Sequence, residues 1–521
     1  MKIKLEYIAI IAIIVLTSYY ALKNSTLPIA FGDEGYHLAM SKWLAQNQIV
    51  PRYDPFVNSG IQHSKTLYPL LFHSIMGFIF LFLGEFGLKI MPAIFAGLTS
   101  LVILVFSKEF DKTGVGGLIA SVAFLMTPSV VLYSFLGYTD TLLALLTTLS
   151  AYFIFKSFEP EATKNQVFLA GIFSGLAMLT KISAAVIFLI LIFCFVLNKF
   201  QKKKTFLMIL IIPLILISSL VIRNIVLFGE PCYYFYAIKQ LPFCNSWYVF
   251  DKEVPQPTLQ FAATGEGTTI LEFGLTNFAN FAFGWAITFL LIFGAITVLV
   301  KKPKYWKFSG IWAMAFLIIP LLMFSIGLGR AEEAARVVLP AVAPIVIVSG
   351  VFVKELYDNI PKNKILSATI IILIISSMWV FAQNKMTVIT GVPGVSNGVK
   401  QFAPSFFDAC KWIKQNTPKD SILFTLQEHP AYYNCDRKFM WDIVGLEEVL
   451  LSGNDNIYTY LKLHEFDYVF VQYFSLSSTP TSKSYSFSFL NYIIEHPEKF
   501  KTVFDNSDVY GNSGSAVFQI L

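Results

Sequence analysis

Apolar runs about as long as a membrane is thick recur along the chain, with short polar loops between them. A membrane-spanning helix needs about 20 predominantly apolar residues. The pattern predicts eleven spans, at residues 5–22, 88–106, 114–132, 138–155, 167–180, 182–198, 205–222, 278–300, 308–327, 337–353 and 365–382. A further apolar run, residues 67–84, is interrupted by Tyr68, Pro69, His73 and Gly77.

Lysine clusters set the direction in which these spans run. The cluster Lys199–Lys204 identifies a cytoplasmic loop, because Lys and Arg accumulate on the cytoplasmic side of membrane proteins. Since successive spans alternate in direction, the lysines of the N-terminus also lie on the cytoplasmic side. So do those of the loops near residues 108–112, 156–164, 301–307 and 354–364. These assignments agree only if residues 67–84 do not cross the membrane. We therefore expect that run to be interfacial or re-entrant, with the N-terminus cytoplasmic.

Composition agrees with a polytopic α-helical membrane protein of about eleven spans. Of all residues, 55% are hydrophobic and 14% are charged, and 51 are Phe. A soluble chain of this length would need more charge to cover its surface. The net charge of +6 comes with lysines beside the spans, so no nucleic-acid partner is indicated. We interpret residues 5–22 as a retained first helix in the plasma membrane, not a cleaved signal peptide.

After residue 382 the pattern changes. Residues 406–415 predict an amphipathic helix, and residues 421–426, 468–473 and 516–521 predict strands rich in Val, Ile, Phe and Tyr. We therefore predict a transmembrane module at residues 1–382, with its first outer loop at 23–87. An extracytoplasmic α/β domain follows at residues 383–521.

The five cysteines form no CxxC pair, so the sequence favours neither a zinc site nor a redox motif. Cys194 lies in an apolar span, as a buried free thiol would. The other four fall on the outer side. There, Cys232 with Cys244 and Cys410 with Cys435 are candidate disulfides in an oxidising compartment, although sequence leaves the connectivity open.

Several acidic residues fall near the outer membrane face. Asp33 and Glu34 follow the first span, with His37 in the same segment, and Asp140 follows Tyr138 at the outer start of another span. Adjacent carboxylates can act as a general base or bind a metal or hydroxyl group. The alternatives are a solvated loop pair for Asp33 and Glu34, and an N-cap for Asp140.

Basic residues fall on the same predicted face. They are Lys65, which precedes Tyr68, together with Lys181, Arg223 and Arg336. Lys and Arg side chains bind phosphate well. Snorkelling is the alternative for Lys181. For Arg336, the alternative is a loop of surface salt bridges with Arg330, Glu332 and Glu333.

Taken in order, these segments resemble the GT-C glycosyltransferases that use polyprenyl-phosphate sugars. This group includes the dolichyl-phosphate-mannose protein mannosyltransferases and the bacterial aminoarabinose transferases. The matching elements are Asp33-Glu34, Lys65 with Tyr68-Pro69-Leu70, Tyr138-Thr139-Asp140, Gly171–Lys181, Arg223-Asn224 and Arg336 with Leu339-Pro340. A Pro-Pro pair usual in the first loop is replaced by Tyr68-Pro69, and no WWDYG-type run occurs. These departures count against protein O-mannosylation and against en bloc oligosaccharide transfer to asparagine.

The resemblance implies inverting transfer of a sugar from a polyprenyl phosphate to a glycan, lipid or protein acceptor on the outer face. Asp33 would be the base, while Glu34 or Asp140 would orient the acceptor. Lys65, Lys181, Arg223 and Arg336 would hold the phosphate, and His37, Tyr68 and Tyr138 would line the acceptor side or the loop. No organic cofactor is required. A divalent cation such as Mg²⁺ or Mn²⁺ is a candidate at Asp33 and Asp140.

Two other classes remain open from sequence. A transporter or flippase of lipid-linked sugars would also carry intramembrane charges. Such proteins place their sites near the midplane and are often built from inverted repeats, whereas here the charges gather at the outer ends of spans. A polysaccharide polymerase or ligase would also work on the outer face, but the context of Asp33 and Glu34 fits it less well.

Overall fold

The computed structural model describes most of the chain. The described residues are 5–29, 33–56, 62–64, 69–112, 114–229, 231, 248–250, 282–301, 306–325, 336, 338–359, 364–392, 396–397, 404–425, 429–440, 456–473, 489–510 and 514–521. The chain divides into two compact units. The first comprises Met1–Leu27, Pro69–Ile222 and Ala263–Gly398, and the second comprises Pro28–Tyr68, Arg223–Ala262 and Val399–Leu521.

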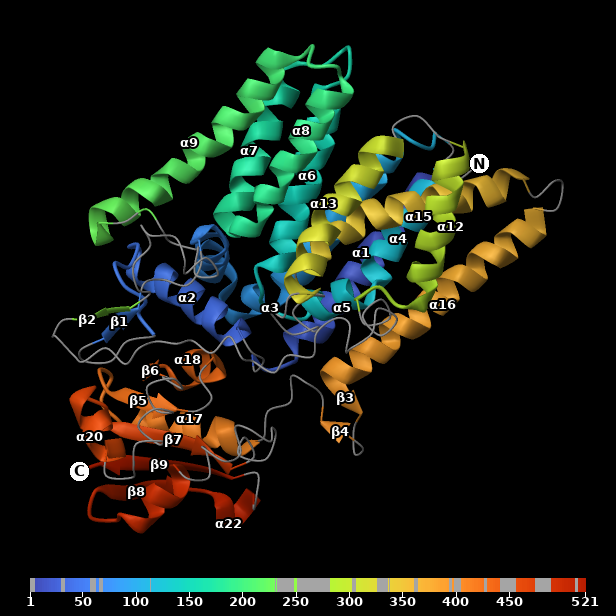
Figure 1. Ribbon diagram of the computed structural model, residues 1–521. Helices are drawn as coiled ribbons and strands as arrows, with labels where there is room; N and C mark the ends of the chain where they lie inside the picture. The colour runs from blue at the N-terminus through green and yellow to red at the C-terminus, as the bar shows by residue number, and fades with distance from the viewer. Residues whose placement is uncertain are drawn as a thin grey trace. The chain divides into compact units, whose positions relative to one another are not determined.

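The first unit is helical (Figure 1). Its helices are α1 (Leu5–Ser25), α3 (Leu71–Ser107), α4 (Val115–Met126), α5 (Pro128–Ser134), α6 (Asp140–Ser157), α7 (Lys164–Thr180), the 3₁₀ helix η1 (Ile182–Val186), α8 (Ile187–Leu197), most of α9 (Lys203–Phe228), α12 (Trp285–Lys301), α13 (Trp306–Ser325), α15 (Leu339–Asn359) and α16 (Lys364–Thr390). A short ladder joins β3 (Gly391–Val392) to β4 (Ser396–Asn397). Each predicted span falls on one or two of these helices.

Within the described residues, four helices are long and apolar enough to cross a membrane: α1, α3, α9 and α15. The pair α4 and α5, which bend by 58° at Thr127, would make a fifth if it forms one span. Three shorter apolar helices lie at Ile182–Leu197, Trp285–Lys301 and Lys307–Leu317. The helical membrane character is thus confirmed, while the total of eleven crossings and their sidedness stay predictions.

The apolar run 67–84 does not form a separate element. It enters α3, whose 37 residues would extend about 55 Å, beyond the roughly 30 Å thickness of a bilayer core. The helix is broken at Gly84, where φ is 59° and ψ is −147°, a conformation that L side chains rarely adopt. The break separates residues 71–83 from the second part of α3, which carries the predicted span 88–106.

Close backbone approaches hold the helices together. A methyl group at Gly116 of α4 would lie 2.8 Å from the carbonyl oxygen of Gly350 in α15. A methyl group at Gly294 of α12 would lie 2.7 Å from the carbonyl oxygen of Val348, also in α15. Small residues at such contacts are usual where helices pack in lipid, because association there depends on van der Waals contact.

The second unit combines the loop after α1, residues 223–262 and the C-terminal domain. Its elements are α2 (Glu34–Asn47), β1 (Gln62–Ser64), β2 (Tyr248–Phe250), α17 (Pro404–Asn416), β5 (Ile422–Thr425), α18 (His429–Cys435), β6 (Lys438–Met440), α20 (Asn456–Leu463), β7 (Tyr468–Gln472), β8 (Phe500–Asp505), α22 (Ser507–Tyr510) and β9 (Ser515–Ile520). Strands β1 and β2 form a two-stranded antiparallel ladder. The predicted α/β character of the C-terminal part is confirmed.

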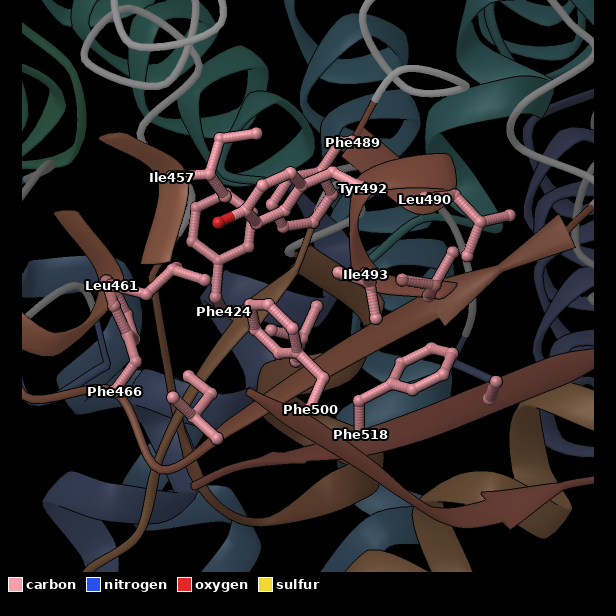
Figure 2. Packing of buried hydrophobic residues seen from close by; sticks show 14 residues of the cluster. Phe424, Ile457, Leu461, Phe466, Phe489, Leu490, Tyr492, Ile493, Phe500 and Phe518 are labelled. Carbon is pink, nitrogen blue, oxygen red and sulfur yellow. The ribbon is translucent and has the colours of Figure 1, made fainter. Parts of the chain in front are cut away.

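The C-terminal sheet has five strands in the order β6-β5-β7-β9-β8. Strand β5 is parallel to β6 and β7, and β9 is antiparallel to β7 and β8. Helix α18 lies between β5 and β6 in the chain, and α20 lies between β6 and β7. Such crossover connections are needed because parallel strands cannot be joined by a tight hairpin. Figure 2 shows the apolar core on the sheet, where Phe424, Phe489 and Phe518 converge with side chains from α20 and the segment before β8.

The predicted helix 406–415 and the three predicted strands correspond to α17, β5, β7 and β9. Strands β6 and β8 were not predicted, because the exposed polar positions of β8 interrupt its apolar pattern. Cys410 and Cys435 form a disulfide, and Cys194 is a free, buried thiol. Cys232 and Cys244 lie outside the described residues.

Candidate active site

Asp140 occupies the first turn of α6. The segment before it runs from Phe135 through Tyr138 without helical structure, and the helix begins at the acidic residue. The N-cap position is Thr139, and its side chain makes no capping bond. Asp140 is therefore not the N-cap residue, which was the alternative for its sequence position. A negative charge in the first turn also benefits from the positive end of the helix dipole.

Two cations bind the carboxylate of Asp140. Oδ1 accepts a hydrogen bond from Nζ of Lys181 at 2.8 Å, and Oδ2 accepts one from Nε of Arg336, also at 2.8 Å. The Asp140 side chain is completely buried, whereas Lys181 and Arg336 keep 18% and 14% of their side-chain area exposed. The three groups together carry one net positive charge.

The backbone breaks at Lys181. Helix α7 ends at Thr180, Lys181 has extended backbone dihedrals, and η1 begins at Ile182. Lys181 lies between the predicted spans 167–180 and 182–198, which are both short for membrane-spanning helices. The break directs the lysine toward the start of α6. Helices α6 and α7 are joined along their length, with a buried hydrogen bond of 2.6 Å between the hydroxyls of Ser150 and Ser174.

Tyr138 lies beside one of the two cations that bind Asp140. The guanidinium carbon of Arg336 lies 4.5 Å from the centre of the Tyr138 ring, within the range of a favourable cation–π contact. The hydroxyls of Thr139 and Thr141 flank Asp140 and are buried, and neither has a hydrogen-bond partner in the described part of the chain. We call Tyr138, Asp140, Lys181 and Arg336 the cationic cluster.

Asp33 and Glu34 lie in the second unit, at the start of α2. The carbonyl oxygen of Asp33 accepts from the backbone N–H of His37 at 2.9 Å, so this turn is regular. Glu34 and His37 are buried, and Asp33 is partly exposed. Tyr36, between them, donates from its hydroxyl to Oδ2 of Asp54 at 2.6 Å.

The remaining predicted site residues are divided between the second unit and the undescribed segments. Arg223 donates from Nη2 to the carbonyl oxygen of Pro51 in the first loop, and from Nη1 to Oδ1 of Asn224 at 3.4 Å. Lys65 and Tyr68 lie outside the described residues, as do Arg330, Glu332 and Glu333. The structure thus brings Asp140, Lys181 and Arg336 together in one unit, and places Asp33, Glu34 and Arg223 in the other.

The expectation of a divalent cation at Asp140 finds no support in this geometry, because both carboxylate oxygens bind cationic nitrogens. In the residues described, no group of three or more His, Cys, Asp or Glu side chains is placed to hold a metal ion. The described residues of the site therefore do not form a metal-binding set.

Asp54 is a buried acid that sequence reasoning missed. Its Oδ2 accepts from Tyr36, and its Oδ1 accepts from the backbone N–H of Phe56 at 2.8 Å. The available signal was the dipeptide Asp54-Pro55, which is typical of a turn. Asp54 orders the chain after α2 and faces the same helix that carries Asp33 and Glu34.

The family model described as dolichyl-phosphate-mannose-protein mannosyltransferase matches residues 64–222. That stretch includes Lys65, Asp140 and Lys181, but not Asp33, Arg223 or Arg336. A search of curated proteins finds no match to the chain.

Solved structures of the same fold cover nearly the whole chain. The oligosaccharyltransferase of Archaeoglobus fulgidus in complex with zinc and sulfate superposes with a TM-score of 0.64 at 14% identity, over 90% of this chain and 68% of that one. AglB from the same organism, with an inhibitory peptide and a dolichol-phosphate, gives 0.64 at 13% identity, over 99% and 74%. ArnT from Cupriavidus metallidurans, bound to undecaprenyl phosphate, gives 0.61 at 13% identity, over 97% of both chains.

These matches confirm the predicted resemblance to GT-C glycosyltransferases. The resemblance is one of sequence over residues 64–222 and one of fold over nearly the full length. At identities of 13% to 14%, the structural likeness establishes the fold alone.

Proposed function

We propose that this protein is a membrane glycosyltransferase that moves a sugar, with inversion, from a polyprenyl-phosphate donor to an acceptor at the extracytoplasmic face. The observation that carries the proposal is the cationic cluster, in which Lys181 and Arg336 converge on one buried carboxylate. It stands in a fold shared with one enzyme solved with undecaprenyl phosphate and another solved with dolichol-phosphate.

Phosphate recognition is assigned to Lys181 and Arg336. Arg offers a planar fork that matches phosphate oxygens, and Lys offers a compact charge. Asp140 holds both cations in place before the donor arrives, and Tyr138 fixes the guanidinium plane of Arg336. Hydrogen-bond donors that are already oriented need not move while negative charge builds up on the leaving phosphate. Lys65 and Arg223 keep the phosphate-binding role that the sequence predicts.

Asp33 is the proposed base. It takes the proton from the acceptor hydroxyl or amine, whose oxygen or nitrogen forms a bond to the anomeric carbon. The bond from that carbon to the phosphate oxygen breaks, and its electron pair leaves on the polyprenyl phosphate. A single displacement of this kind inverts the anomeric carbon. Glu34 orients the acceptor, and His37 and Tyr68 lie on the same first loop.

The test combines transfer with donor binding. Membranes containing the protein are incubated with a panel of labelled donors: undecaprenyl-phosphate mannose, glucose and aminoarabinose, and dolichyl-phosphate mannose. We expect at least one label to move into a non-donor product, and Asp33→Asn to lower that transfer by about 100-fold or more, given what acid–base groups contribute. Full transfer by Asp33→Asn would overturn the base assignment.

Binding is measured separately on the purified full chain, with undecaprenyl phosphate and with undecaprenol, which lacks the phosphate. We expect the phosphate lipid to bind and the alcohol not to, and Lys181→Ala and Arg336→Ala to weaken binding. Lys156→Ala is the matched control, because Lys156 is 20% exposed and pairs with Glu109 and Glu159. Equal binding of the two lipids, or equal losses in all three variants, would contradict the proposal.

A further inference from the structure

The helix that carries Asp33 and Glu34 packs against the C-terminal domain. Helices α2 and α18 are neighbours within the second unit, as Figure 1 shows. The rings of Tyr36 and Tyr432 meet edge-on with centroids 6.3 Å apart, and both side chains are buried. Farther along, Lys42 forms an ion pair of 3.3 Å with Asp436, which directly follows α18. The C-terminal domain therefore forms part of the immediate surroundings of α2.

Two hydrogen bonds to backbone carbonyls bracket the segment that contains α2. Before the helix, Nδ2 of Asn434 donates to the carbonyl oxygen of Ile29 at 2.7 Å. After it, the backbone N–H of Phe439 donates to the carbonyl oxygen of Phe56 at 3.2 Å. Ile29 is itself buried. The chain before α2 is thus bound at Ile29 by a residue that precedes Cys435. The chain after α2 is bound at Phe56 by a residue that follows the turn after Cys435.

Helix α18 is held firmly in its own domain. Cys435, its last residue, forms the disulfide to Cys410 on α17. Two residues later, the guanidinium of Arg437 donates to the carbonyl oxygens of Lys414 and Thr417 at 2.9 and 2.8 Å, closing the C-terminal end of α17. Because α18 is tied to α17 by a covalent bond and by this buried arginine, it offers α2 a rigid support.

We propose that Asn434 is a positioning residue for the transfer reaction: through the carbonyl of Ile29 it sets where α2 begins, and so where Asp33 and Glu34 stand. In this proposal Asn434 acts through the backbone of Ile29 and not on the substrate. It supplies one neutral donor to a buried backbone acceptor, and leaving such an acceptor without its hydrogen bond is costly. Catalysis is sensitive to shifts of about 1 Å in such groups. The inference rests on the proposed role of Asp33.

The test uses Asn434→Asp in the full chain, because aspartate has nearly the same shape but no N–H to donate. Asn416→Asp is the matched control. Asn416 lies on α17 in the same domain, is exposed, and donates to the carbonyl of Trp412 in its own helix. If Asn434→Asp does not accumulate as folded protein, Asn434→Ser takes its place, since it shortens the side chain and keeps it neutral.

Hydrogen exchange is the first readout. We expect the amides of residues 33–47 to exchange about 10-fold faster or more in Asn434→Asp, with those of α7 and α15 unchanged, and no change in the control. Unaltered exchange in 33–47 would overturn the proposal. This readout needs no activity, so it decides the positioning role even if the proposed transfer reaction is wrong.

Kinetics is the second readout. We expect Asn434→Asp to lower the turnover number about 10-fold or more for the donor that the wild type uses, while its affinity for undecaprenyl phosphate stays within about twofold. A general loss of structure would lower both the turnover number and the affinity for undecaprenyl phosphate. Loss of lipid affinity equal to the loss of turnover, or an unchanged turnover number, would contradict positioning through α2.

Discussion

Asp140 is fully buried, and both cations that bind it are mostly buried as well. Removing one member of such a pair is costly, because it leaves a charge without its partner in a medium of low dielectric constant. Exposed pairs elsewhere in the chain, such as Lys108 with Glu6 at 3.1 Å, contribute far less, since water screens them. The cationic cluster therefore contributes to stability as well as to the proposed phosphate recognition.

We expect Asp140→Asn to destabilise the protein by about 3 kcal/mol, because a neutral group then replaces the buried carboxylate that binds both Lys181 and Arg336. Adding Lys181→Met should recover part of that loss, since the double variant leaves only one of the two cations. Thermal unfolding of the four proteins in detergent measures the coupling. Strictly additive losses would contradict a direct interaction between the two residues.

Helix α7 approaches α9 closely because it presents glycines to it. A methyl group at Gly171 would lie 2.8 Å from Cβ of Ile212, and one at Gly175 would lie 2.5 Å from Cδ1 of Leu216 and 3.1 Å from Cα of Pro213. The Gly-x-x-x-Gly spacing places both on one face of the helix. These two positions set the distance between α7, which ends at Lys181, and its neighbour.

We expect Gly175→Ala to lower the free energy of unfolding by about 1–3 kcal/mol, because the backbone near Pro213 would have to move. The control is Gly310→Ala in α13, where nothing lies within 4 Å of the added methyl group. There, alanine should be neutral or stabilise the helix by up to about 1 kcal/mol. Equal effects at the two positions would show that α7 and α9 tolerate a wider separation.

Helices and strands were predicted well where a single hydrophobic pattern runs along the whole element. Long apolar runs identified the helices of the first unit, because these helices carry apolar side chains along their length, at buried and exposed positions alike. Strand β8 was missed because the exposed polar residues Lys501 and Thr502 are adjacent and interrupt its apolar pattern, and β6 because it has only three residues. The boundary between the predicted spans 167–180 and 182–198 falls at Lys181, where α7 ends and η1 follows.

The candidate site was predicted in part. Charge and sidedness predicted one candidate site, made of Asp33, Glu34, Lys65, Asp140, Lys181, Arg223 and Arg336. The structure pairs Asp140 with Lys181 and Arg336, and the roles of all these residues stay predictions. Sequence did not reveal that both cations share the carboxylate, because the partners are separated by 41 and 196 positions. The contacts of Asn434 and Asp54 were missed for the same reason, since no local pattern connects residues so far apart.

At the scale of the whole molecule, the lysine pattern predicts which parts face the cytoplasm. We expect Lys501→Cys, on the C-terminal domain, to react with a membrane-impermeant maleimide in intact cells. Lys203→Cys, at the start of α9, should react only after the membrane is permeabilised. Both positions are exposed, and labelling is measured as the gain over the unsubstituted protein. Labelling of Lys203→Cys in intact cells would reverse the predicted orientation.

The hydrogen bond between Asn434 and Ile29 joins residues 405 positions apart. At a synthesis rate of about 5–20 residues per second, the first loop waits roughly 20 to 80 s for its partner. Throughout that interval the helices of the first unit are made and inserted while α2 lacks its support. The contact between α2 and the C-terminal domain can therefore form only after α18 has been made, and we expect a chain truncated before α18 to lack this support for the segment that bears Asp33.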